Sequence, residues 1–180
     1  MKITTTKLAG VLIIEPRIFP DSRGYFFESF QAERYQEQGI PAFVQDNFSR
    51  SNQNVMRGLH YQLEHPQGKL IFVARGKVLD VIVDIRKNSP TFGQFIAIEL
   101  DDQMHRQVYI PPGFAHGFCV ISQEAECIYK CTDYYHPPSE RGILWNDPDL
   151  QIPWPVKNPI VATKDETLPQ LKNISEKELF

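Results

Sequence analysis

The chain has 180 residues, of which 42% are hydrophobic and 23% charged, and 19 Lys and Arg against 22 Asp and Glu give a formal net charge of −3. This length suits one domain, and a chain of this size buries roughly 70% of its unfolded surface, so its core needs no disulfide or structural metal. Because no block of basic residues is present, the composition excludes a general nucleic-acid binder, which needs a clustered positive surface.

The N-terminus and the cysteines indicate a cytoplasmic protein. Residues 1–6 contain no apolar run typical of a signal peptide, and no segment approaches the ~20 apolar residues of a membrane helix. The three cysteines, Cys119, Cys127 and Cys131, are an odd number without an export signal, which predicts buried free thiols in a reducing compartment. No Cys-x-x-Cys pair indicates zinc.

Short segments rich in β-branched and aromatic residues follow one another along the chain and are separated by turn signals. The sequence predicts strands at 11–14, 43–45, 70–74, 78–85, 95–100, 107–110, 117–121 and 125–131. Only two segments favour helical structure: 31–38, which Gly39 and Pro41 end, and 175–178, where a single turn is expected. Many short strands with few helices indicate an antiparallel sandwich or barrel. The Pro-rich segment from about 137 to 180 is expected to wrap around the barrel.

The segment 78–85 shows the clearest alternation. Its odd-numbered residues are all apolar, whereas Asp80 and Asp84 share the other face with Val78 and Ile82. This pattern predicts a barrel wall whose polar side lines a cavity or meets solvent.

Two histidines lie in informative contexts. His60 ends Arg57-Gly58-Leu59-His60, and His116 follows a Pro-Gly turn at the start of an apolar segment. Strand alternation places Arg57 and His60 on opposite faces. A bulge at Gly58 would bring both to one face, as an anion-binding group beside an acid/base. Without a bulge, Arg57 is a surface charge.

Four other residues each have a chemical and an ordinary interpretation. Lys69 is a cavity cation or a charge at a strand end, and Tyr129 is an acid or a packed aromatic. Tyr135 is a platform for a nucleobase or rim packing, and Asp165 is a functional carboxylate or a solvated charge. None of these signals is specific alone.

Taken in order, the motifs resemble dTDP-4-dehydrorhamnose 3,5-epimerases from about Leu12 to Leu168. The similarity lies in Phe19-x-Asp21-x-Arg23-Gly24-x-Phe26-x-Glu28, Val44-Gln45-Asp46-Asn47-x-Ser49, Arg57-Gly58-Leu59-His60, Gln67-Gly68-Lys69, Ser89-Pro90-Thr91-Phe92-Gly93, Ile110-Pro111-x-Gly113-Phe114-Ala115-His116-Gly117-Phe118, Tyr129-Lys130-x-Thr132, Tyr134-Tyr135, Leu144-Trp145-Asn146-Asp147-Pro148 and Lys164-Asp165. One departure is Phe48, where the family often has histidine.

The resemblance implies a single all-β domain over 1–180, with a double-stranded β-helix (jelly-roll, cupin-like) barrel and short peripheral helices. It implies inversion of C3 and C5 of a dTDP-4-keto-6-deoxy sugar without a cofactor or metal. His60 would be the base, oriented by Asp165; Tyr129 would be the acid on the opposite ring face, and Lys69 would stabilise the enolate.

The resemblance also implies a nucleotide-sugar site and a homodimer. The binding residues would be Arg23, Glu28, Gln45, Asn47, Arg57, His116, Glu140 and Lys164, with Tyr135 stacking on thymine. The N-terminal strands would pair across the dimer, so that Arg23 or Glu28 serves the neighbour's site. We add Asp80 as a partner for His116.

Three alternatives remain. A metal-dependent cupin enzyme needs a His-x-His pair, a carboxylate and a third histidine, but Gln62 stands two residues after His60. A related enzyme could invert only C3 or only C5, or act on another nucleotide sugar. A non-catalytic sugar-binding module would be expected to lack the base or the acid.

Overall fold

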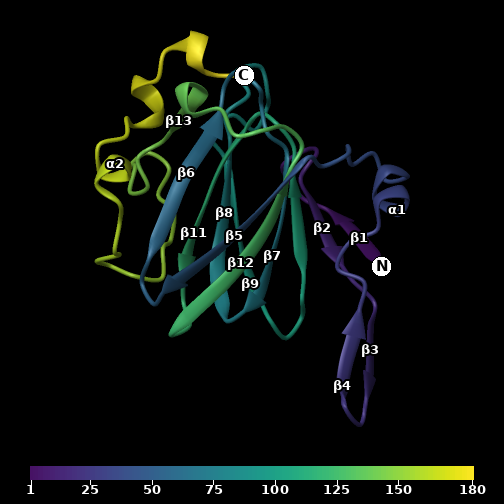
Figure 1. Ribbon diagram of the computed structural model, residues 1–180. Helices are drawn as coiled ribbons and strands as arrows, with labels where there is room; N and C mark the ends of the chain where they lie inside the picture. The colour runs from purple at the N-terminus through teal and green to yellow at the C-terminus, as the bar shows by residue number, and fades with distance from the viewer.

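The computed structural model describes residues 1–180 and arranges most of them in two antiparallel sheets that face each other (Figure 1). The larger sheet has the order β1 (Lys2–Thr5), β2 (Leu12–Glu15), β10 (Gln107–Ile110), β7 (Lys69–Arg75), β12 (Glu124–Cys131) and β5 (Gln45–Asn52). The second sheet has the order β13 (Glu140–Gly142), β6 (Met56–Gln62), β11 (Phe114–Val120), β8 (Lys77–Asp84) and β9 (Phe95–Asp101).

The remaining elements are short and lie outside the two sheets. They are the hairpin of β3 (Ile18–Asp21) and β4 (Gly24–Phe27), the helices α1 (Ala32–Gln36) and α2 (Thr163–Glu166), and single 3₁₀ turns at Pro137–Ser139, Leu171–Asn173 and Glu176–Glu178. Neither helix has the length and apolar character that crossing a membrane requires. The structure thus confirms the predicted all-β, jelly-roll class with short peripheral helices.

Most predicted strands appear within a few residues of their expected bounds, but the prediction at 43–45 is wrong. The strand in this region is β5, Gln45–Asn52, and apart from the exposed Phe48 it is polar on both faces. The side chains of Gln45, Asn47 and Ser49 line a cavity rather than an apolar core, so the apolar alternation on which strand prediction depends is missing. The helix predicted at 31–38 is α1, where the Gln31 side chain accepts a hydrogen bond from the N–H of Arg34.

Strand β8 is buried on both faces. Val78 and Ile82 belong to the core between the sheets, whereas Val81 and Val83 pack under the C-terminal segment. Asp80 and Asp84 are fully buried, so the alternative in which their face meets solvent is wrong.

Asp84 is stabilised as a buried anion by three side chains. Arg86 donates from Nε and Nη2 at 2.9 and 2.7 Å, and the hydroxyls of Ser89 and Thr91 each donate at 2.6 Å. Burial alone raises the pKa of this carboxyl, but these hydrogen bonds outweigh burial and lower the pKa to about 2.

We expect Asp84→Asn to lower the free energy of unfolding at neutral pH by about 2 kcal/mol. Because the folded-state pKa is depressed, this stabilisation is complete above the unfolded pKa near 4 and disappears as pH falls through about 2. Urea unfolding of both proteins between pH 7 and pH 2 measures the difference. The control is Asp149→Asn, since the Asp149–Lys172 pair is 57% exposed on each side and exposed pairs contribute little. A difference that persists unchanged at pH 2 would contradict the expectation.

The C-terminal segment covers the outer face of the five-stranded sheet. Trp154, Ile174 and Phe180 pack against the buried cluster that includes Val81 and Val83, and Ile160 forms a parallel bridge with Val55 beside β6. Helix α2 follows this bridge and contacts β6. This route brings residues 160–165 to the mouth of the barrel.

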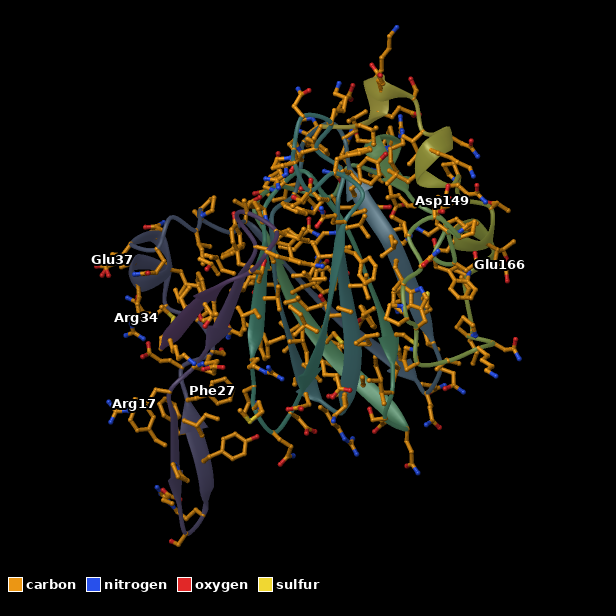
Figure 2. All side chains as sticks on the ribbon, turned by 180° about the vertical axis from the view of Figure 1, so that it is seen from behind. Arg17, Phe27, Arg34, Glu37, Asp149 and Glu166 are labelled. Atoms are coloured by element: carbon orange, nitrogen blue, oxygen red, sulfur yellow. The ribbon has the colours of Figure 1, made fainter.

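The β3–β4 hairpin projects from the barrel as a separate arm (Figure 1). It carries three exposed aromatic side chains, Phe19, Tyr25 and Phe26, which are 47%, 57% and 66% exposed. Figure 2 shows Phe27 of this arm on the opposite side of the molecule from Glu166 of α2. A cluster of exposed aromatics on a projecting arm is typical of an interaction surface.

Candidate active site

A cavity of about 610 Å³ opens between the two sheets, a size typical of small-molecule sites. Its walls come from the inward faces of β5, β7 and β12 on one sheet and of β6 and β11 on the other, and α2 lies at its mouth. Of the residues predicted for the site, the cavity is lined by Gln45, Asn47, Arg57, His60, Lys69, His116, Tyr129, Tyr135, Glu140, Lys164 and Asp165.

Of the two alternatives for Arg57 and His60, the structure has the one with a bulge at Gly58. On β6 and β11, His60 pairs with His116 and Arg57 with Phe118, so the two residues Gly58 and Leu59 of β6 lie opposite the single residue Gly117 of β11. Gly58 has a φ of +112°, and a Cβ there would lie 2.6 Å from Cα of Gly117, so only glycine fits. The extra residue brings Arg57 and His60 to the same cavity.

His60 and Asp165 form a hydrogen-bonded pair across 105 residues of sequence, with 2.7 Å between Nε2 and Oδ1. Asp165 is 2% exposed, so its interpretation as a solvated charge is wrong. Burial raises the pKa of this carboxyl, but the hydrogen bond from His60 and the N–H of Gly58 act more strongly, and its pKa lies below the ordinary value. The carboxylate therefore stays ionised and orients the imidazole.

His116 and Asp80 form a second pair directly beside the first. Nε2 of His116 lies 2.7 Å from Oδ2 of Asp80, which confirms the suggested partnership. Asp80 is fully buried, and its Oδ1 has no hydrogen-bond partner. Since His116 and His60 are opposite each other in the strand ladder, the backbone fixes the distance between the two pairs.

Lys69 and Tyr129 extend from the opposite wall, on β7 and β12. The Lys69 ammonium makes no hydrogen bond or ion pair within the chain. Burial lowers its pKa, which Cys131, Glu140 and Asp80 oppose only in part. Burial likewise raises the pKa of the Tyr129 phenol, so the phenol stays protonated at neutral pH. One wall of the cavity thus presents two histidine–aspartate pairs, and the other presents a cation and a phenol.

Glu140 connects three site residues at the mouth of the cavity. Its carboxylate accepts hydrogen bonds from Lys164 Nζ at 2.9 Å and Tyr135 Oη at 3.3 Å, and it lies 4.0 Å from Nδ1 of His60. Burial raises the pKa of Glu140, but Lys164, His60 and Tyr135 together bring it below the ordinary value.

Two predicted residues, Arg23 and Glu28, lie outside the cavity of their own chain. The Arg23 side chain is 88% exposed next to the turn of the β3–β4 arm and pairs with Asp21 at 2.6 Å. Glu28 follows the arm and pairs with Arg34 at 3.1 Å.

Sequence reasoning assigned no role to the serines of β5, although Ser49 ends one of the motifs. Ser49 lines the cavity with a buried Oγ that has no partner, and Ser51 accepts a hydrogen bond from Nε of Arg57 at 2.9 Å. Every second residue from Gln45 to Ser51 is polar and points inward, and this alternation of purely polar side chains was the available signal.

Comparison with known proteins points to one family. A family model described as dTDP-4-dehydrorhamnose 3,5-epimerase matches residues 5–173. The chain is 51% identical to the dTDP-4-dehydrorhamnose 3,5-epimerase of Shigella flexneri, over 92% of this chain and 93% of that protein. It is 38% identical to the dTDP-4-dehydrorhamnose 3-epimerase of Streptomyces niveus, over 92% and 82%. A crystal structure of dTDP-6-deoxy-D-glucose-3,5-epimerase from Legionella pneumophila with dTDP-4-keto-L-rhamnose superposes with a TM-score of 0.96, at 51% identity, over 99% of this chain and 96% of that chain.

Proposed function

The chain belongs to the dTDP-4-dehydrorhamnose 3,5-epimerase family, and from this premise we propose that it converts dTDP-4-keto-6-deoxy-D-glucose to dTDP-4-keto-L-rhamnose. It is then an isomerase of dTDP-L-rhamnose biosynthesis. The hydrogens on C3 and C5 of this substrate both lie α to the C4 ketone, so removing either gives an enolate whose charge rests mainly on the C4 oxygen. Inversion follows when the proton returns from the other ring face.

The base in this proposal is His60. Because Asp165 binds Nε2, the neutral imidazole carries its proton there and Nδ1 is free to accept one. A histidine, with an ordinary pKa of ~6.5, suits proton removal near neutral pH.

The oxyanion group is Lys69, whose ammonium has no partner in the chain and so remains available to the C4 oxygen. A preformed donor at developing charge is worth more in an enclosed site than in water. His116, held by Asp80, adds a second polar group at this end of the cavity.

The observation that carries the proposal is the placement of base and acid on opposite walls. His60 stands on β6 of the five-stranded sheet and Tyr129 on β12 of the six-stranded sheet, and both line one cavity. A sugar ring between them meets a base on one face and a phenol on the other. Single-wall acid/base groups, by contrast, would return the proton to the face from which it came.

The nucleotide is assigned to the mouth of the cavity. Arg57 and Lys164 provide cations for the diphosphate, and Tyr135, which is half exposed, offers its ring to thymine. Asn47 and Gln45 lie along the same wall.

Proton NMR of the substrate with enzyme in deuterated water tests the function. We expect deuterium at both C3 and C5, with inversion at both. Exchange and inversion at only one carbon would favour a single-site epimerase, an activity that the name of the Streptomyces niveus relative carries. Absence of exchange at either carbon would overturn the proposal.

We further propose a homodimer in which the β3–β4 arm of each chain reaches the cavity of the other. The arm exposes Phe19, Tyr25 and Phe26 and carries Arg23 away from its own cavity. At micromolar concentration, light scattering should give twice the mass of 20.8 kDa. Arg23→Ala should raise KM for the substrate at least tenfold, as expected when a charge-assisted contact is lost. A fully active monomer would contradict this arrangement.

Activity should survive prolonged dialysis against a strong chelator. No group of three or more His, Cys, Asp and Glu side chains is arranged to hold a metal ion, and Lys69 supplies positive charge at the cavity. Turnover before and after dialysis, with added Zn²⁺, Fe²⁺ or Mn²⁺ as controls, measures this. Loss of activity that one of these ions restores would favour the metal-dependent cupin instead.

Finally, we propose one domain over residues 1–180 in the cytoplasm. The continuous family match over 5–173 supports the single domain, and the three buried free thiols suit a reducing compartment.

A further inference from the structure

The segment that carries Tyr135 is fixed by side chains rather than by its own backbone. The residues Asp133, Tyr134 and Tyr135 form no backbone–backbone hydrogen bond. Instead, three glutamine amides bind one main-chain group in each of four consecutive residues. Gln67 Nε2 donates to the carbonyl of Asp133 (2.9 Å) and Gln62 Nε2 to the carbonyl of Tyr134 (3.0 Å), while Gln45 Oε1 accepts from the N–H of Tyr135 (2.9 Å) and Gln62 Oε1 from the N–H of His136 (2.8 Å).

Gln62 is the central member of this group. Its side chain is nearly fully buried on β6, and its amide also donates to the carbonyl of His65 at 2.5 Å. Both donors and the acceptor of the amide are therefore used. No other residue type of this length offers two donors and an acceptor without a charge, so the position is specific for glutamine.

The three glutamines come from separate parts of the chain. Gln45 begins β5 in one sheet, Gln62 ends β6 in the other, and Gln67 lies in the loop before β7. The segment 133–136 thus bridges the mouth of the barrel and is bound to both walls. Apart from the hydrogen bond of its N–H to Gln45, Tyr135 has one polar contact, from its hydroxyl to Glu140 at 3.3 Å.

We propose that Gln45, Gln62 and Gln67 form a glutamine clamp that holds the Tyr135 ring in place to stack on the base of the nucleotide. An exposed aromatic ring contributes fully to binding only when it is ordered before the ligand arrives, because ordering it afterwards costs conformational entropy. Gln62 is a positioning residue in this scheme, and Gln45 acts through Tyr135 rather than through direct contact with the base. The inference rests on the proposed function, since it requires a nucleotide at Tyr135.

The first test compares Gln62→Met with wild type. Methionine keeps the length of the side chain and removes every hydrogen bond. We expect affinity for dTDP, measured by calorimetry, to fall about tenfold, with KM for the substrate rising in parallel and kcat within about twofold. Affinity for inorganic pyrophosphate, which lacks a base, should stay unchanged. Gln53→Met is the matched control, because Gln53 also donates to a main-chain carbonyl, that of Ile121 at 3.1 Å, but at an exposed place outside the site.

A double-mutant cycle then separates positioning from general stability. In a Tyr135→Ala background, Gln62→Met should change dTDP affinity less than twofold, because the ring that it positions is gone. An equal loss in both backgrounds, or a fall in kcat with KM unchanged, would overturn the clamp. If Gln62→Met does not fold, Gln67→Met replaces it in the same cycle, with a smaller expected loss of about threefold. If the wild-type protein does not bind dTDP, both the clamp and the proposed function are overturned. If Gln62→Met binds dTDP as tightly as wild type, only the clamp is overturned.

Discussion

His60→Ala is expected to lower kcat by about 10³- to 10⁴-fold while dTDP affinity stays within about threefold of wild type. The His60 imidazole combines a free ring nitrogen, Nδ1, with a buried carboxylate on its other nitrogen, since Asp165 holds Nε2 at 2.7 Å. General base catalysis contributes 10²- to 10⁴-fold. Binding energy should come mainly from the diphosphate and thymine, which His60 does not contact in the proposed arrangement.

Asp165→Asn provides the companion variant. The amide keeps the shape of Asp165 but does not stabilise the imidazolium, so kcat should fall by roughly 10- to 100-fold, less than in His60→Ala. Turnover, dTDP calorimetry and exchange at C3 and C5 should be followed for both variants. Wild-type exchange in His60→Ala would move the base to another group, and His116 with Asp80 is the next pair available in the cavity.

Tyr129→Phe is expected to separate proton removal from inversion. His60 can return a solvent-derived deuteron to the face from which it took the proton, and that path labels the sugar without changing its configuration. Inversion needs a donor on the opposite wall, and burial keeps the Tyr129 phenol protonated. The variant should therefore still incorporate deuterium, at least at C3, while epimerised product at C5 falls by about 10²-fold or more.

NMR that follows label position and ring configuration together measures this separation. The control for disturbance of the strand is Cys127→Ser. Cys127 is buried and lies two residues before Tyr129 on β12, on the same face of the strand. Loss of exchange as complete as in His60→Ala would assign Tyr129 to proton removal or positioning. Normal inversion would make another group or a water the acid.

The local backbone features of the site could be predicted from the sequence. Gly58 between Arg57 and His60 predicted the bulge because glycine tolerates the positive φ that a bulge requires, and the strand register confirms it. The alternation in 78–85 likewise predicted β8. In both cases the residues whose pattern made the prediction lie within a few positions of one another in the sequence.

Contacts between distant segments could not be predicted in the same way. Asp165 approaches His60 only because the C-terminal segment crosses the barrel and ends in α2, a helix of four residues with almost no sequence signal. Strand β5 escaped prediction because its inward face is polar. From the sequence, Gln62 indicated only that a histidine needed for a metal site is missing. Its hydrogen-bond partners could not be predicted, because they lie in two loops that come together only in the fold.

Lys69 is a site of local frustration in the wall of the cavity. Burial lowers the pKa of the Lys69 ammonium, which is partly buried at the cavity and has no partner in the chain, so the charged form opposes folding there. Selection for thermal stability alone would therefore favour an apolar residue such as methionine at this position, and the resulting protein would fold better and turn over worse. An anionic oxygen that reaches the ammonium offsets this cost, so we expect a bound anionic ligand to raise the free energy of unfolding. We therefore expect substitutions that raise heat resistance without loss of turnover to lie at positions other than Lys69.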